Sequence, residues 1–188
     1  MDFRCWYVIF VMTGQEEKVR DQLKDNLAKQ GLSPAEYLIP KRWLRERNAE
    51  TGEWEEVLKV MFPGYVLIGT DDVDQVAAIA AGITGVLRLL KTDNDEFYQL
   101  PMEEISWIAY LTDEGDVIEE SEVYLDEDNR IVVQFGPLKG EEGRIKRFNR
   151  RSRRVAVEFL IGVERREVWL SVRVVAPEST SIIIERSR

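Results

Sequence analysis

The sequence contains no histidine and a single cysteine, Cys5, among its 188 residues. Without a second cysteine no disulfide can form within the chain, and without histidine a zinc site built from cysteine and histidine ligands is excluded. Nucleophiles of the Ser–His–Asp or Cys–His type are excluded as well, because both need an imidazole. We therefore expect a protein that is not an enzyme and that binds neither a metal ion nor a cofactor.

Long apolar runs are missing too. The longest, from Cys5 to Met12, has eight residues, whereas a membrane-spanning helix needs about 20. Asp2 and Arg4 precede this run and no small-residue cleavage site follows it, which argues against a signal peptide. The sequence thus predicts a soluble, cytoplasmic protein without a membrane partner, and we expect it to be a monomer.

Charge is distributed unevenly along the chain, which has 26 basic and 35 acidic side chains and a net charge of −9. Residues 1–112 hold 12 basic and 19 acidic side chains, residues 113–128 hold nine acidic and no basic ones, and residues 130–176 hold 12 basic and five acidic ones. Because like charges oppose compaction, residues 113–128 are predicted to be an acidic linker, with room for a short ordered piece at 123–125. It would separate an N-terminal domain (1–112) from a small basic domain (129–178), with 179–188 as an edge strand or a tail. The alternative is an acidic loop within one domain.

The pattern of apolar residues in the N-terminal part predicts an α+β fold. Strands are expected where β-branched and aromatic residues follow one another, and helices where apolar residues recur every third or fourth position. The succession β-α-β-β-α-β-α is typical of a ferredoxin-like sandwich, in which the helices pack mainly on one face of an antiparallel sheet. In this succession the hairpin with arms at 37–47 and 53–59 counts as one unit, the other expected strands are 3–12, 62–68 and 85–90, and the expected helices are 15–30, 73–81 and 102–111.

Two of these strands, 3–12 and 62–68, are apolar on both faces, although the helices of such a sandwich cover only one. Tyr65 and Leu67, with a matching residue of the first strand such as Phe10, would then form an exposed apolar patch. Patches of this kind mark partner-binding surfaces. The competing explanation is that the third helix or the hairpin at 42–59 covers the second face.

The hairpin itself is expected to have a structural role. Its first arm is basic and its second arm is acidic, so opposed charges and a Trp43/Trp54 pair across the arms would stabilise it. We favour this interpretation over a ligand-binding role for these charges.

The C-terminal part, residues 130–176, contains five short β-rich runs separated by turns, which predicts a small β-barrel. Six basic residues fall within the nine positions from 146 to 154, with Phe148 among them, and no acidic residue lies between 143 and 157. Such a run can make several phosphate contacts, and arginine also stacks on bases. The predicted nucleic-acid-binding residues are Lys139, Arg144, Lys146, Arg147, Arg150, Arg151, Arg153, Arg154, Arg165 and Arg166.

Three motifs in this chain resemble those of the NusG family of transcription elongation factors. The run WYVI at 6–9, continuing to Gly14 and Glu16, is similar to the family's first strand and helix entry. The run FPGYV at 62–66 matches the most specific signature of the family, and GPLKGEEGRI at 136–145 matches its KOW motif. Ribosomal proteins also contain KOW motifs, so the pairing with the upstream signature makes the resemblance specific. It covers nearly the whole chain.

The resemblance implies that the N-terminal domain, called NGN in this family, docks on the clamp helices of RNA polymerase, bridges the DNA channel and favours processive elongation. The non-template DNA strand is a further candidate partner. By position, the residues that would bind the polymerase are Phe10, Phe62, Pro63, Gly64, Tyr65 and Leu67. In the general factor the barrel recruits Rho or a ribosomal protein through apolar loop residues, and Leu138, Leu160 and Ile161 occupy the corresponding positions here.

The dense arginine turn at 146–154 departs from the general factor and resembles LoaP, a specialised paralogue whose barrel is thought to bind an RNA hairpin in the nascent leader. We therefore expect a specialised antiterminator that binds RNA polymerase and a structured RNA leader. The alternative is a general elongation factor. Pro137 and the valine-rich strands favour a constitutive barrel over the helical hairpin of a further paralogue.

Two hypotheses from other classes are disfavoured. A magnesium-dependent enzyme would use Asp93, Asp95 and Glu96, but this run lacks the spacing of a calcium-type loop. An RNA-binding sheet of the RRM type in the first domain would need an RNP1 motif, which is missing, and a less acidic domain.

Overall fold

The structure is a computed structural model that describes residues 5–32, 35–112, 116–162 and 164–177. The edge strand or tail predicted at 179–188 lies outside these ranges. No helix within them is long and apolar enough to cross a membrane.

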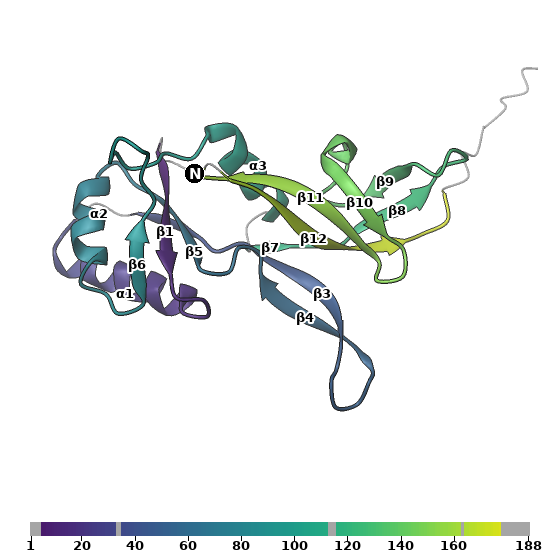
Figure 1. The fold of residues 1–188 in the computed structure, drawn as a ribbon, viewed down its shortest axis with the longest axis horizontal. Coiled ribbons are helices and arrows are strands. Elements are labelled where there is room, and N and C mark those ends of the chain that lie inside the picture. The colour runs from purple at the N-terminus through teal and green to yellow at the C-terminus, as the bar shows by residue number, and fades with distance from the viewer. Residues whose placement is uncertain (1–4, 33–34, 113–115, 163, 178–188) are drawn as a thin grey trace, which may run out of the picture.

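A four-stranded antiparallel sheet forms the centre of the N-terminal part, with strand order β2-β5-β1-β6. Its strands alternate with two helices in the order that the sequence predicts (Figure 1). The elements are β1 (Trp6–Val11), α1 (Glu16–Lys29), β2 (Glu36–Leu38), β5 (Tyr65–Gly69), α2 (Val73–Ala80) and β6 (Val86–Leu89).

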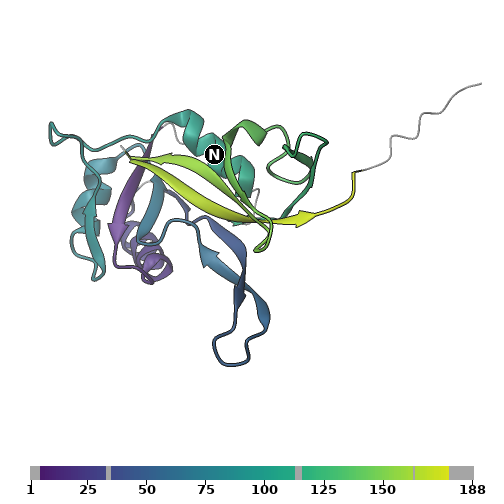
Figure 2. The ribbon, with the colours of Figure 1, turned by 45° about the vertical axis from the view of Figure 1, so that its right-hand side comes forward.

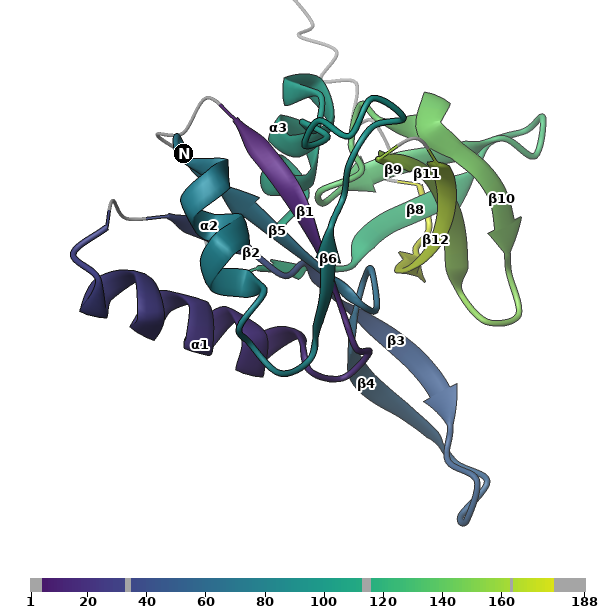
Figure 3. The same cartoon turned by 60° about the vertical axis from the view of Figure 1, so that its left-hand side comes forward.

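Helices α1 and α2 cover one face of this sheet, as Figure 3 shows. Val19, Leu23 and Leu27 recur every fourth residue on α1, and all three are buried. They belong to one apolar core with Ile9 of β1 and Val66 of β5. This half of the fold follows directly from the periodicity of the sequence.

Between β2 and β5, strands β3 (Lys41–Arg47) and β4 (Trp54–Val60) form a hairpin that projects from the body of the molecule (Figure 2). The predicted Trp43/Trp54 pair does not form, because the register places Trp43 opposite Leu58 and Trp54 opposite Arg47. The guanidinium of Arg45 instead lies 5.3 Å from the centre of the Trp54 ring. Lys59 and Glu46 form an ion pair at 3.2 Å between the arms, but with the charges reversed from the prediction, because the acid lies on β3 and the base on β4.

The C-terminal part is a curled five-stranded sheet with strand order β10-β11-β12-β8-β9. Within the described residues β9 and β10 are its two edges, so strand pairing does not close the expected barrel. Two of the five short runs predicted from the sequence, 166–170 and 173–175, form one long strand. The elements are β8 (Ser121–Leu125), β9 (Ile131–Phe135), the short 3₁₀ helix η2 (Glu142–Arg144), β10 (Ile145–Asn149), β11 (Arg154–Ile161) and β12 (Glu164–Val174).

The acidic stretch 113–128 differs from the predicted linker. It contributes β7 (Val117–Ile118), which pairs with β3, and β8, which pairs with β9 and β12. Ile118 and Val123 are only 3% and 1% exposed. Burial of these apolar side chains, together with strand pairing, outweighs the repulsion between neighbouring carboxylates on the exposed side.

The second face of the N-terminal sheet is also covered, so the prediction of an exposed apolar patch is wrong. Helix α3 (Met102–Thr112) covers part of it, which is the alternative that the sequence left open. The rest lies against the end of β11, where Phe159 stacks on Trp107 at 4.4 Å and meets Phe62 edge-to-face at 5.6 Å. One apolar core therefore runs from the N-terminal sheet through α3 into the C-terminal sheet. We call this the closed arrangement.

Candidate functional site

The turn before β5 carries the FPGY signature and is fixed from two sides. The Gly64 N–H donates to Glu16 Oε1 at 2.7 Å, and the Gly64 carbonyl accepts from the Val11 N–H at 2.9 Å. Gly64 has a φ of +84°, and a Cβ there would lie 3.2 Å from the Val11 carbonyl oxygen. Glycine is therefore required, because other residues are strained at this φ and lack room.

This turn delivers an aromatic cluster to the second face of the sheet. We call Phe10, Phe62, Tyr65 and Leu67 the docking face. The rings of Phe10 and Tyr65 are 4.7 Å apart, and the Arg166 guanidinium of the C-terminal sheet lies 4.5 Å from the Tyr65 ring. Tyr65 is 7% exposed, Phe62 2% and Leu67 0%, and burial raises the pKa of the Tyr65 hydroxyl. The other two predicted docking residues lie in the turn, where Pro63 is exposed and Gly64 is buried.

The predicted nucleic-acid-binding cations fall into three groups. Seven of the ten are exposed, and four of these seven make no ion pair within the described residues: Lys139, Arg150, Arg151 and Arg153. The last three stand together on the turn between β10 and β11, which we call the arginine turn. Its backbone is held by the Asn149 Oδ1, which accepts the Ser152 N–H at 3.0 Å.

A second group is neutralised within the C-terminal sheet by acids of β11 and β12. Glu158 pairs with Arg165 at 2.8 Å and with Lys146 at 3.8 Å. Arg166 pairs with Glu164 at 2.8 Å, and Arg147 pairs with Glu167. The absence of acids from 143–157 in the sequence therefore does not leave the whole cationic surface free, because strand pairing brings acids beside it.

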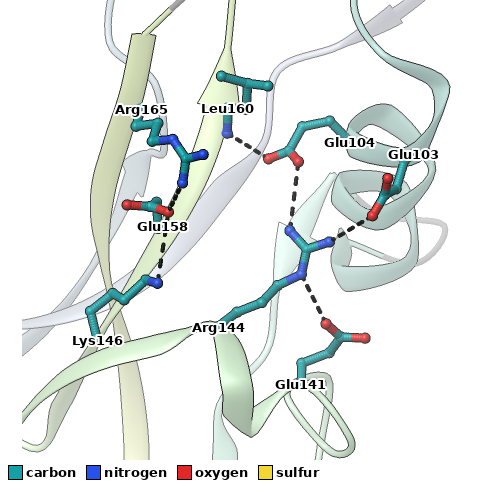
Figure 4. A network of polar contacts seen from close by, with 8 residues as sticks. All are labelled: Glu103, Glu104, Glu141, Arg144, Lys146, Glu158, Leu160 and Arg165. Carbon is teal, nitrogen blue, oxygen red and sulfur yellow. Dashed lines mark hydrogen bonds and ion pairs between the residues drawn. The ribbon is translucent and has the colours of Figure 1, made fainter.

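A third group contacts the N-terminal part. Arg144 lies 3.5 Å from Glu103 and 3.6 Å from Glu104, both on α3 (Figure 4). Glu104 Oε1 also accepts the Leu160 N–H of β11 at 2.7 Å. We call these four residues the latch. Burial raises the pKa of the Glu104 carboxyl, although the Leu160 amide and Arg144 act in the opposite direction.

Two further polar contacts join the parts of the molecule. Arg154 donates from a terminal nitrogen to the Arg45 carbonyl of the hairpin. The Tyr98 hydroxyl donates to the Gly162 carbonyl at 2.8 Å. A cleft of about 240 Å³ opens beside the latch, and Arg144, Arg165 and Glu104 are among its lining residues.

The three residues predicted to recruit a protein partner do not form an exposed loop. Leu138 and Ile161 are 1% and 2% exposed, and Leu160 is half-buried beside the latch. The Leu138 N–H donates to the Ser121 Oγ at 3.0 Å. Gly136 has a φ of +102°, and a Cβ there would lie 2.7 Å from the Ser121 Cα, so the start of the KOW motif joins β8 to β9.

Sequence reasoning missed Glu16, Glu104 and Trp107. Glu104 lies beside Glu103 in the first turn of α3, where acidic residues are common, so nothing in the sequence marks it or pairs it with Arg144. The acidic run at 93–96 forms a local turn in which Lys91 pairs with Asp95 at 2.8 Å. In the described part of the chain, no group of three or more Asp, Glu, Cys or His side chains could hold a metal ion.

Comparison with known proteins identifies relatives. Residues 4–109 match the family model described as "Transcription termination factor nusG". The chain is 25% identical over 144 residues to the "Transcription termination/antitermination protein NusG" of Staphylococcus epidermidis, which covers 75% of this chain and 78% of that one. It is 27% identical over 157 residues to the protein of the same description from Halalkalibacterium halodurans, over 81% and 86% of the two chains.

A solved structure titled "Domain interaction in Thermotoga maritima NusG" is similar with a TM-score of 0.53 and 18% identity, over 89% of this chain and 93% of that chain. This likeness supports a shared fold.

Proposed function

This chain belongs to the NusG family, and we propose that it docks on the clamp helices of RNA polymerase through the docking face. As a NusG-like protein it is a transcription elongation or antitermination factor rather than an enzyme. The observation that carries the proposal is the aromatic cluster that the signature turn delivers to β5. An aromatic and aliphatic surface of this kind is typical of the centre of a protein–protein interface.

Docking of this kind requires the closed arrangement to open. Tyr65 is 7% exposed and lies under Arg166, so a partner cannot reach it while β11 and β12 cover it. In our proposal the C-terminal sheet moves away as a unit and leaves Phe10, Phe62, Tyr65 and Leu67 to the polymerase.

For the C-terminal sheet we propose binding to a structured RNA leader through the arginine turn. Its three arginines are exposed, make no ion pair in the described residues and lie within four successive turn positions. Unpaired arginines bind phosphates and stack on unpaired bases. The resulting molecule would be a specialised antiterminator that connects the polymerase to one class of transcript.

The polymerase contact is tested by pull-down of bacterial RNA polymerase with Tyr65→Ala and Phe10→Ala. Both variants should lose the polymerase, because the docking face loses its central rings. Tyr110→Ala on α3 removes a 61% exposed ring elsewhere and should retain it. Circular dichroism checks that each variant is folded, and full retention by both docking-face variants would refute the proposal.

RNA binding is tested by gel shift with an RNA stem-loop and the triple variant Arg150→Ala, Arg151→Ala and Arg153→Ala. Affinity should fall, and the slope of log K against log salt should flatten by about 0.7 to 0.9 for each lost phosphate contact. The matched control removes three exposed lysines of α1, with changes to Ala at Lys18, Lys24 and Lys29. Equal affinity of the two triple variants would contradict an RNA site at this turn.

A general elongation factor, whose C-terminal sheet recruits a protein such as Rho or a ribosomal protein, is the second candidate. It is favoured by the pairing of Arg147, Arg165 and Arg166 with acids, which reduces the charge available to RNA. Polymerase binding by the wild type together with no RNA binding would select this function.

A further inference from the structure

Two arginines meet where the hairpin lies against the C-terminal sheet, and neither has a counter-ion. Arg42 belongs to β3 and Arg154 begins β11, and β3 also lies against β12. Both side chains are half-buried, and neither makes an ion pair within the described residues. Arg154 donates to the Arg45 carbonyl, which holds its guanidinium beside the hairpin. Two like charges are therefore close together and partly removed from water.

The donors of these two arginines are buried without acceptors. In the described part of the chain, the Nε and Nη1 atoms of Arg42 and the Nε atom of Arg154 have no hydrogen-bond partner. The Oγ of Ser171 on β12 is a fourth buried atom without a partner. Ser171 is 6% exposed and lies directly opposite Arg154 in the pairing of β11 with β12, so both side chains project from the same face. We call Arg42, Arg154 and Ser171 the guanidinium cluster.

The surrounding acids do not neutralise this cluster. Burial, and then the charge of Arg154, lower the pKa of Arg42 to about 10, and Glu46 acts in the opposite direction. The Glu46 carboxylate, however, pairs with Lys59 at 3.2 Å. A buried guanidinium without a partner is costly, and a second positive charge beside it adds to that cost. The cluster therefore lacks both a negative charge and hydrogen-bond acceptors.

A small anion supplies both. Water molecules would accept the hydrogen bonds but would leave the two like charges without a counter-charge, and a large ligand does not reach donors that are buried. An oxyanion of the phosphate type carries negative charge and accepts several hydrogen bonds from guanidinium and hydroxyl groups. We propose that the guanidinium cluster binds a free inorganic oxyanion, with inorganic phosphate as the probe, and that this ion joins the hairpin to β11 and β12. The site is independent of the docking face and of the arginine turn.

The experiment is thermal unfolding of the full chain, followed by circular dichroism, while chloride is exchanged for inorganic phosphate at constant ionic strength. Phosphate is kept at low concentration, so that its general stabilising effect on proteins stays small. The unfolding midpoint should rise along a saturable curve, by about 3 to 6 °C at ten times the dissociation constant. Uridine monophosphate, whose phosphate carries a nucleoside, should have a weaker effect because the donors are buried. No rise with phosphate, or a rise with the nucleotide alone, would refute the site.

Variants separate the guanidinium cluster from the exposed cations of the chain. Arg42→Met removes one unpaired buried charge, so without phosphate it should unfold no earlier than the wild type, and phosphate should no longer raise its midpoint. Ser171→Ala keeps the net charge and should raise the dissociation constant for phosphate about tenfold. Arg151→Met in the arginine turn makes the same change of charge at an exposed position and should keep the whole phosphate effect. Equal phosphate effects in Arg42→Met and Arg151→Met, or loss of the effect in Arg151→Met alone, would overturn the proposal.

Discussion

At the scale of single residues, the signature turn depends on a buried carboxylate far from it in sequence. Glu16 begins α1, is 3% exposed and accepts the Gly64 N–H. Its position at the helix start is also favourable for a negative charge, because backbone N–H groups point toward it there. The same side chain therefore anchors α1 and sets the path of the chain into β5.

We predict that Glu16→Ala lowers the free energy of unfolding by about 1 to 3 kcal/mol, because the buried Gly64 N–H loses its acceptor. Glu16→Gln, which keeps an acceptor oxygen, should cost less. Urea denaturation followed by circular dichroism measures both. Glu17→Ala is the matched control, since Glu17 is exposed and pairs with Lys41 at the surface, and its effect should be below about 1 kcal/mol. Equal losses at both positions would contradict a special role for Glu16.

The latch should make closure depend on pH. The Glu104 carboxyl has a raised pKa in the closed arrangement, mainly from burial. It therefore binds its proton more tightly there than in an open state, so closure is favoured at low pH and weakens as pH rises through the raised pKa. The distance between spin labels at Asp25→Cys on α1 and Glu127→Cys in the turn between β8 and β9, with Cys5→Ser removing the native thiol, reports this change when it is followed by pulsed electron paramagnetic resonance between about pH 4 and pH 8.

Glu104→Gln keeps an acceptor for the Leu160 N–H but cannot titrate, so it should reduce the pH dependence. Burial raises the pKa of Asp116 and Glu120 as well, so a part of the pH dependence is expected to remain. A pH profile identical to that of the wild type would show that Glu104 does not contribute.

At the scale of elements, β11 is the strand that joins the two parts. It pairs with β12 along its whole length and with β10 along its first half, and its end reaches α3 and the docking face. Phe159 is 0% exposed between Trp107 and Phe62. The buried residues of β11, three of them consecutive at 155–157, contribute both to the C-terminal sheet and to the contact with the N-terminal part.

We predict that Phe159→Ala opens the molecule, because loss of a buried phenylalanine ring costs about 3 to 5 kcal/mol and much of that contact lies between the two parts. Hydrogen exchange should increase at α3 and β5, and binding of a hydrophobic dye should rise. Phe148→Ala on β10 is the control, since its ring is half-buried and belongs to the C-terminal sheet. Retained exchange protection at α3 and β5 in Phe159→Ala would refute this role of β11.

At the scale of the whole molecule, one apolar core spans both parts, from Trp6 of β1 to Val168 of β12. A shared core of this kind couples the unfolding of the parts. The acidic and the basic part of the chain also attract each other in the closed arrangement. The latch places Arg144 against an acid of α3, and Arg166 lies against the ring of Tyr65.

We predict that the wild type unfolds in one cooperative transition, with coincident curves from tryptophan fluorescence and far-ultraviolet circular dichroism. Phe159→Ala should separate the transition into two, because the parts then lose their common core. Two transitions in the wild type would show that the closed arrangement contributes little to stability.

Much of the secondary structure followed from the sequence because it depends on local patterns. The stripe of Val19, Leu23 and Leu27 predicts α1, and the apolar runs predict β1 and β5. The acidic stretch was misread because charge repulsion is visible along the chain, whereas the burial of Ile118 and Val123 depends on distant strands. The pairing of Arg147 with Glu167 was invisible for the same reason.

The sequence alone determined that no histidine-dependent chemistry operates here, that helices alternate with strands in the first part, and that basic residues gather in the second. The tertiary structure decided what the docking face touches. Its apolar residues have to be buried against something, and the sequence could not say whether a partner or the chain's own β11 would cover them. The hydrophobic effect is non-directional, so it does not by itself select which surface covers these residues. The packed arrangement shows that the chain's own C-terminal sheet does, because Phe159 lies against Phe62 and Arg166 lies against Tyr65.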